Sequence, residues 1–99
     1  MPLDWDEVKR RYGDGAQVPT VAGGKTLDVT GADDEHIYIQ TRLWKDALRR
    51  ADLEKAVALI EEGRMTRQPG AFAEEYRTIV ADARGTSVAH VLKDMGHLD

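Results

Sequence analysis

The residues of this 99-residue chain that could do chemistry are three histidines and a few groups of carboxylates. His90, Asp94 and His97 are spaced so that a helix would place two imidazoles and a carboxylate on one face, as a divalent metal site requires. Gly96 is expected to end that helix before His97, and the helix dipole favours a histidine near a C-terminus without any metal. We therefore expect neither a metal site nor a bound cofactor here.

Other candidate motifs have ordinary structural explanations. The acidic run Asp33–Glu35 lacks the alternating ligand spacing of a calcium loop and is expected in a solvated turn. Gly24–Thr26 matches the end of a phosphate-binding loop, but Pro19 stands where that motif requires a glycine. His36 has no acid–base partner visible in the sequence. The absence of cysteine excludes disulfides, thiolate zinc sites and cysteine catalysis. We expect that the protein is not an enzyme.

The composition is that of an ordinary folded protein, with 41% hydrophobic and 32% charged residues. The length allows one hydrophobic core, and no repeat or flexible linker divides the chain, so we expect a single globular domain over residues 1–99. The N-terminus is acidic, without a signal-peptide pattern, and no stretch is long and apolar enough to span a bilayer. These features predict a soluble cytoplasmic protein that does not bind membranes.

The N-terminal residues predict a short helix. Asp4 and Glu7 form an Asp variant of the capping box, which supplies hydrogen-bond acceptors and negative charge at the start of a helix. The pattern extends to Tyr12, and Gly13 or Gly15 is expected to end it.

A region typical of β-structure follows. Three β-favouring runs are separated by turn signals, and they cover residues 17–21, 27–29 and 37–39. Gly23 and Gly24 predict a tight hairpin, whereas residues 31–35 predict a longer polar turn. Short turns indicate antiparallel neighbours, hence a three-stranded meander. Residues 43–48 fit either a fourth strand or the start of the next helix, and we favour the strand.

The rest of the chain predicts three amphipathic helices. Apolar residues recur at helical spacing, and a glycine follows each segment; the segments are 53–60 before Gly63, 72–83 before Gly85, and 87–95 before Gly96. Thr86 and Ser87 are expected to cap the last helix with their hydroxyls. A meander cannot bury its apolar face alone, so these helices should cover one side of it. The predicted class is therefore α+β, with a short N-terminal helix, a three- or four-stranded antiparallel meander, and three helices packed on the sheet.

The densest basic cluster surrounds an aromatic residue. Its members, which we take as the candidate interaction surface, are Arg42, Trp44, Lys45, Arg49 and Arg50. A basic strip around an exposed aromatic is what binding of single-stranded nucleic acid requires. Tryptophan is usually highly buried, however, so we expect Trp44 in the core.

The C-terminal third loosely resembles a helix-turn-helix, with a helix, a glycine-containing turn and a capped helix. The resemblance implies that the last helix would present polar side chains to the major groove of DNA. Only Arg84 and Lys93 are basic there, and many structural helix pairs share this pattern.

Three functions remain as hypotheses. We favour a non-enzymatic protein-interaction or regulatory module that binds another protein or a copy of itself, with Trp5, Tyr38 and Trp44 as anchors if they are exposed. The alternative is a nucleic-acid-binding regulator that uses the basic strip from Arg42 to Arg50 or the C-terminal helix pair. The net charge of −4 disfavours that alternative without excluding a local basic face. An enzyme that uses residues such as His90 is the least favoured, and no small-molecule substrate is evident.

Overall fold

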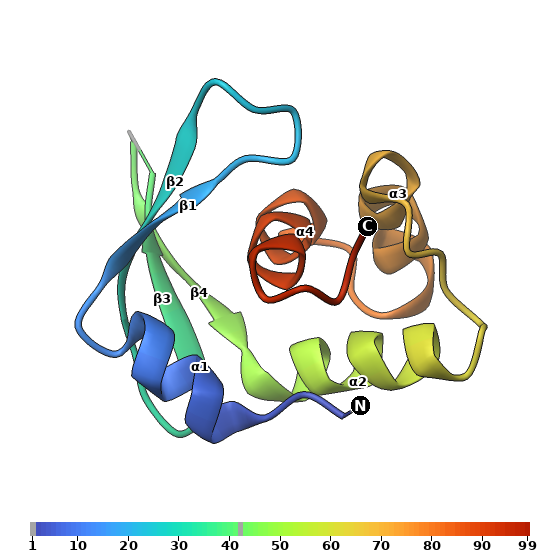
Figure 1. Cartoon of the computed structure of the whole chain (residues 1–99). Coiled ribbons are helices and arrows are strands. Elements are labelled where there is room, and N and C mark those ends of the chain that lie inside the picture. The colour runs from blue at the N-terminus through green and yellow to red at the C-terminus, as the bar shows by residue number, and fades with distance from the viewer. Residues whose placement is uncertain (1, 42) are drawn as a thin grey trace.

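The computed structural model describes residues 2–41 and 43–99 and has an α+β fold. A short helix precedes four strands, and three helices complete the chain (Figure 1): α1 Trp5–Tyr12, β1 Ala16–Pro19, β2 Thr26–Ala32, β3 His36–Gln40, β4 Lys45–Arg49, α2 Arg50–Glu61, α3 Pro69–Ile79 and α4 Gly85–Asp94. The predicted fold class is confirmed. The ambiguous segment 43–48 contributes the fourth strand, β4, as favoured.

The four strands form one antiparallel meander in the order β1-β2-β3-β4. Ile37 and Ile39 alternate with exposed Tyr38 along β3, so one face of the sheet is apolar and the other faces solvent. Ile37 lies opposite Leu48 of β4, and Ile39 lies opposite Val29 of β2. The hydrophobic period of two therefore sets the pairing register, because a slip of one residue would expose the buried side chains.

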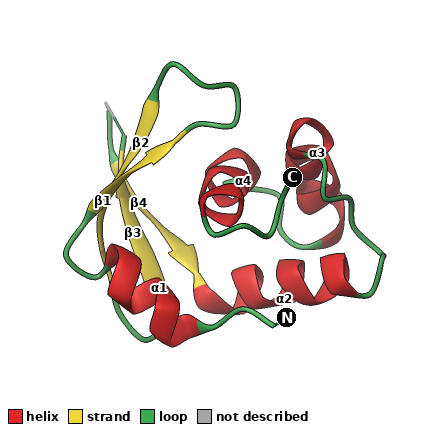
Figure 2. Cartoon of the chain, in the orientation of Figure 1, coloured by secondary structure: helices red, strands yellow, loops and turns green. Residues whose placement is uncertain are grey.

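Helix α4 lies between the sheet and α3 (Figure 2). Helix α4 contacts β1 on one side and α3 on the other, while α2 continues directly from β4. Phe72, Tyr76, Leu53 and Leu92 are fully buried and join the inward strand residues in one core cluster. Burial of each such side chain contributes about 1.5–3 kcal/mol.

Helix α1 begins as its capping pattern predicts. The Asp4 side chain accepts hydrogen bonds from the backbone N–H groups of Asp6 and Glu7, at 3.0 and 3.4 Å. Tyr12 is the last residue of α1, and its hydroxyl donates to the Asp94 carboxylate of α4 at 2.6 Å. The Asp4 cap therefore stabilises the start of α1, and the hydrogen bond from Tyr12 to Asp94 ties its end to α4.

The junction between α3 and α4 differs from the prediction. Helix α3 ends at Ile79 instead of Ala83, and α4 begins at Gly85 without a side-chain cap from Thr86 or Ser87. A Cβ on Gly85 would lie 2.8 Å from the Ala73 carbonyl oxygen, so this glycine allows the two helices to approach closely. Gly85 therefore serves helix packing, and its predicted role as a helix stop is wrong.

The connection between β1 and β2 is a longer loop than the predicted tight hairpin. It spans residues 20–25, and the Thr20 N–H donates to the Lys25 carbonyl at 3.1 Å. Gly23 and Gly24 both have φ of +80°, a conformation that glycine adopts without steric cost. The paired glycines indicated the turn, whereas a hydrogen bond from the Val21 N–H to α4 fixes the loop against the helices.

Candidate functional site

The turn between β3 and β4, which we call the hairpin tip (residues 41–44), is tightly hydrogen-bonded. The Thr41 hydroxyl accepts from the Trp44 N–H at 3.1 Å, and the Thr41 N–H donates to the Trp44 carbonyl at 2.7 Å. The Gln40 side-chain amide donates to the Thr41 carbonyl at 2.9 Å. These bonds join Thr41 to Trp44 and to the flanking Gln40. Arg42 lies outside the described residues.

Two large apolar side chains of the hairpin tip face solvent. Leu43 is 79% exposed and Trp44 is 56% exposed. The expectation that Trp44 is in the core is therefore wrong. The last β3–β4 pair is Gln40 with Lys45, so Trp44 lies beyond the paired strands.

The solvent face of the sheet adds a second exposed aromatic side chain. Tyr38 is 39% exposed, and the His36 ring stacks on it with ring centroids 5.8 Å apart. The Tyr38 hydroxyl donates to the Asp33 carboxylate, and this bond lowers the pKa of Asp33 and raises that of Tyr38. Tyr38 is thereby held in place in the middle of an otherwise polar face.

The described members of the predicted basic strip have different surroundings. Arg49 forms an ion pair with Asp52 at 3.5 Å, and Lys45 stands four residues away beside the hairpin tip, about 13 Å along the strand. Arg50 begins α2, stacks over the Trp5 ring at 5.3 Å and donates to the Asp34 carbonyl at 3.1 Å. Lys45 is therefore the described basic residue that stays next to Trp44.

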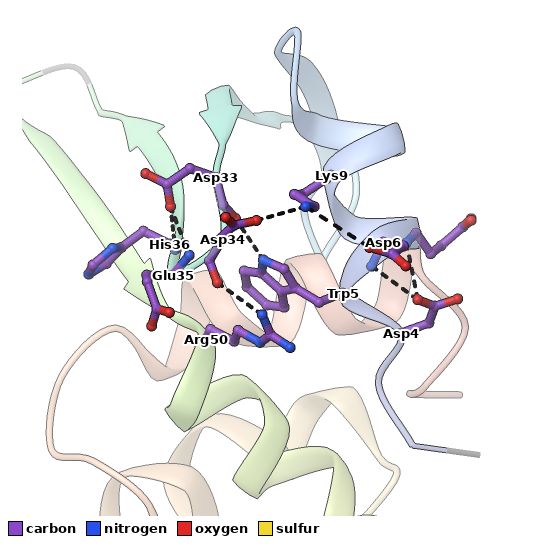
Figure 3. Close-up of polar contacts among 10 residues, drawn as sticks. Asp4, Trp5, Asp6, Lys9, Asp33, Asp34, Glu35, His36 and Arg50 are labelled. Carbon is purple, nitrogen blue, oxygen red and sulfur yellow. Dashed lines mark hydrogen bonds and ion pairs between the residues drawn. The ribbon is translucent and has the colours of Figure 1, made fainter.

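A polar junction, which the sequence reasoning missed, joins α1, α2 and the β2–β3 turn (Figure 3). The Trp5 indole N–H donates to the Asp33 carbonyl at 2.6 Å, and Lys9 forms an ion pair with Asp34 at 2.7 Å. The hydrogen bond to Asp34 raises the pKa of Lys9. These partners are 25 to 28 residues apart in sequence, so no local motif could reveal them. Each group serves the fold, and we assign no chemistry to the junction.

The candidate metal ligands on α4 have other partners. His90 accepts a hydrogen bond at Nδ1 from the Val21 N–H at 3.0 Å, and Asp94 accepts from the Tyr12 hydroxyl. Helix α4 ends at Asp94, so His97 lies outside it. Burial lowers the pKa of both histidines and, with the Asp94 hydrogen bond, raises that of Tyr12. Among the described residues, no group of three or more potential ligands is arranged to hold a metal ion.

The helix pair that resembles a helix-turn-helix is used for packing. Helix α4 lies between the sheet and α3, and Val88, Ala89, Val91 and Leu92 are all buried. Arg84, at its start, forms an ion pair with Asp46 of β4 at 2.7 Å. Most of the helix surface is therefore covered and is not available to enter a DNA groove.

A shallow cleft lies between the N-terminal segment and α2. Pro2, Leu3 and Ala58 provide its apolar surface, and its volume is about 420 Å³. Three carboxylates surround it: Glu54, Glu61 and Glu62. We call it the acidic cleft.

Comparison with known proteins adds no family. No protein-family model matches the chain, and no curated protein or solved structure shows significant similarity to it. No helix in residues 2–41 or 43–99 is long and apolar enough to cross a membrane.

Proposed function

We propose that this protein is a non-enzymatic protein-interaction module whose docking surface is the hairpin tip together with the adjoining part of the solvent face. Its anchors are Leu43 and Trp44, with Lys45 and Tyr38 beside them. The observation that carries the proposal is the combination of the exposed Leu43 and Trp44 side chains with the hydrogen bonds that join Trp44 to Thr41.

An exposed apolar side chain that is already restrained in the free protein favours binding at this surface. A large apolar side chain gains nothing for folding when it stays in water, and Trp44 makes no part of the core cluster. A partner that covers Trp44 buries the exposed part of its side chain, and the hydrogen bonds to Thr41 already restrain Trp44 before binding, which reduces the entropy lost on association. Tryptophan dominates many protein interfaces for this reason.

Nucleic-acid binding has weaker support. Arg49 and Arg50 are engaged within the domain, and the carboxylate of Asp52 beside Arg49 lowers the positive potential at the end of β4. Phosphate contacts by Lys45 alone would give weak binding that falls steeply with salt. A salt titration with random single-stranded and duplex DNA tests this alternative, and binding at physiological salt would favour it over our proposal.

The direct test uses the purified protein and matched variants. Wild type, Trp44→Ala and Ile79→Ala are used as bait in an extract of the native host, where Ile79 is a control because it is 42% exposed on another helix. Each captured protein is then purified and titrated against all three baits. We expect a partner whose affinity falls at least about tenfold with Trp44→Ala and is unchanged with Ile79→Ala. Equal affinities for all three baits would contradict the proposal.

A further inference from the structure

The same chain carries a protruding apolar surface and a recess of matching chemistry. We infer that the hairpin tip of one copy docks in the acidic cleft of a second copy, so that the protein associates with itself head to tail. This inference rests on the proposed function, since it names a second copy as the partner of the hairpin tip.

The docking element is apolar with a cation at its base. Leu43 and Trp44 project into solvent, and Lys45 follows them as the first residue of β4. Within the described part of the chain Lys45 forms no ion pair, so its ammonium group remains available to a partner. A partner surface that fits this element needs an apolar floor and carboxylates at its rim.

The acidic cleft has that composition. Its apolar part comes from Pro2, Leu3 and Ala58, and all three of its charged residues are glutamates. All three have partners within the chain: Glu54 lies 3.3 Å from Arg50, Glu62 lies 3.8 Å from Arg64, and Glu61 is also engaged. Because these pairs are partly exposed, each carboxylate keeps part of its attraction for a further cation. A lysine from a second copy would therefore meet a rim whose lining charges are all negative.

The positions of the two surfaces determine the kind of assembly. The hairpin tip lies at one end of the molecule, and the N-terminal segment with α2 lies at the other (Figure 1). A tip cannot reach the cleft of its own chain, and the two contacting surfaces differ. The contact therefore joins two different surfaces, and it can build a two-fold dimer with two reciprocal tip–cleft contacts, a closed ring or a growing chain of subunits.

Sedimentation velocity on the full chain tests association directly. Wild type at low ionic strength should shift from monomer toward larger species as its concentration rises from about 10 μM to about 1 mM, a range typical of small interfaces. Iodide quenching gives a second readout, because Trp5 is 4% exposed and Trp44 is 56% exposed. Only the quenching due to Trp44 should decrease on association.

Two complementary variants test the head-to-tail arrangement. Trp44→Ala removes the anchor and leaves the cleft, whereas Ala58→Arg fills the cleft and leaves the anchor; Ala58 is exposed on α2, where arginine is a good helix former. Each variant alone should associate at least about tenfold more weakly than wild type, but an equal mixture should form a dimer, because one intact tip meets one intact cleft. Ile79→Ala should behave as wild type.

Three results would overturn the inference. They are a wild type that stays monomeric at about 1 mM, an Ile79→Ala variant that weakens association as much as Trp44→Ala, and a mixture of the two complementary variants that stays monomeric. Circular dichroism of each variant confirms that it is folded. If wild type is monomeric while a different protein binds in a Trp44-dependent manner, the inference fails and the proposed function stands. If no partner of either kind depends on Trp44, both fail.

Discussion

Strand β3 lies between two turns that differ in how their contacts are used. At its start, the β2–β3 turn receives hydrogen bonds from Trp5 and Arg50 and an ion pair from Lys9, so it is tied to both α1 and α2. At its other end, Thr41 and Trp44 of the hairpin tip are hydrogen-bonded to each other, and the side chains of Leu43 and Trp44 are exposed to solvent. One turn holds the fold together, and the other presents its side chains to solvent.

The two tryptophans express the same difference. Trp5 is almost fully buried and its indole N–H is satisfied by the Asp33 carbonyl, while Trp44 is more than half exposed. Residue type alone does not show whether a tryptophan stabilises the fold or is exposed for binding. The tertiary surroundings of the side chain make that distinction. Each prediction below perturbs one side of this comparison.

The largest effect is expected from Trp5→Ala. The change removes a buried indole, leaves the Asp33 carbonyl without its donor and removes the ring under Arg50. The free energy of unfolding should fall by about 3–5 kcal/mol. Urea denaturation followed by circular dichroism measures it, and Trp5→Phe provides a milder variant in case the alanine protein does not fold. A loss below about 1 kcal/mol would show that the junction is not structural.

Two adjacent arginines should respond very differently to the same substitution. Arg50→Met keeps the aliphatic stem but loses the contact with the Trp5 ring and the bond to the Asp34 carbonyl, and should lower the free energy of unfolding by about 1–2 kcal/mol. Arg49→Met loses a partly exposed ion pair with Asp52 and should stay within about 0.5 kcal/mol. Chemical denaturation of the two variants side by side tests the contrast, and equal losses would contradict it.

The β1–β2 loop should make an intermediate, pH-dependent contribution to the free energy of unfolding, because the Val21 N–H of the loop donates to the titratable His90 side chain of α4. Burial lowers the pKa of His90 and His97 below the ordinary 6.5, so the unfolded chain takes up these protons first. The free energy of unfolding should therefore be constant above about pH 6.5 and fall as the pH decreases from there toward the folded-state pKa values.

Urea denaturation between about pH 8 and about pH 5.5, where carboxylates stay ionised, measures this slope. His90→Asn should reduce it, because the side-chain oxygen of the asparagine can still accept from the Val21 N–H but does not titrate. The effect should be smaller than that of Trp5→Ala or Arg50→Met. An unchanged slope in His90→Asn would exclude the histidine as its source.

The smallest effect on stability is expected from Trp44→Ala. The side chain lies outside the core, so the free energy of unfolding should change by no more than about 0.5 kcal/mol. The fluorescence of this variant should resist iodide, because Trp5 is its remaining tryptophan and is buried. A loss comparable to that of Trp5→Ala would contradict the assignment of Trp44 to binding.

The elements of secondary structure were largely predictable from local patterns. The capping residues of α1, the alternation along β3 and the apolar spacing of α2 and α4 each depend on neighbours in sequence, which determine backbone conformation directly. The fold class followed from the order of these patterns. The residues of the candidate surface were also singled out, because an aromatic within a basic cluster is unusual in a sequence.

Only the tertiary structure decided how those residues are used. Arg49 and Arg50 are adjacent in sequence, yet the change from strand to helix between them sends one along the sheet and the other onto Trp5. Trp44 is exposed because the pairing of β4 with β3 begins only at Lys45, which leaves Trp44 beyond the paired strands. Periodicity identifies an apolar face, but what covers that face depends on contacts between residues distant in the chain.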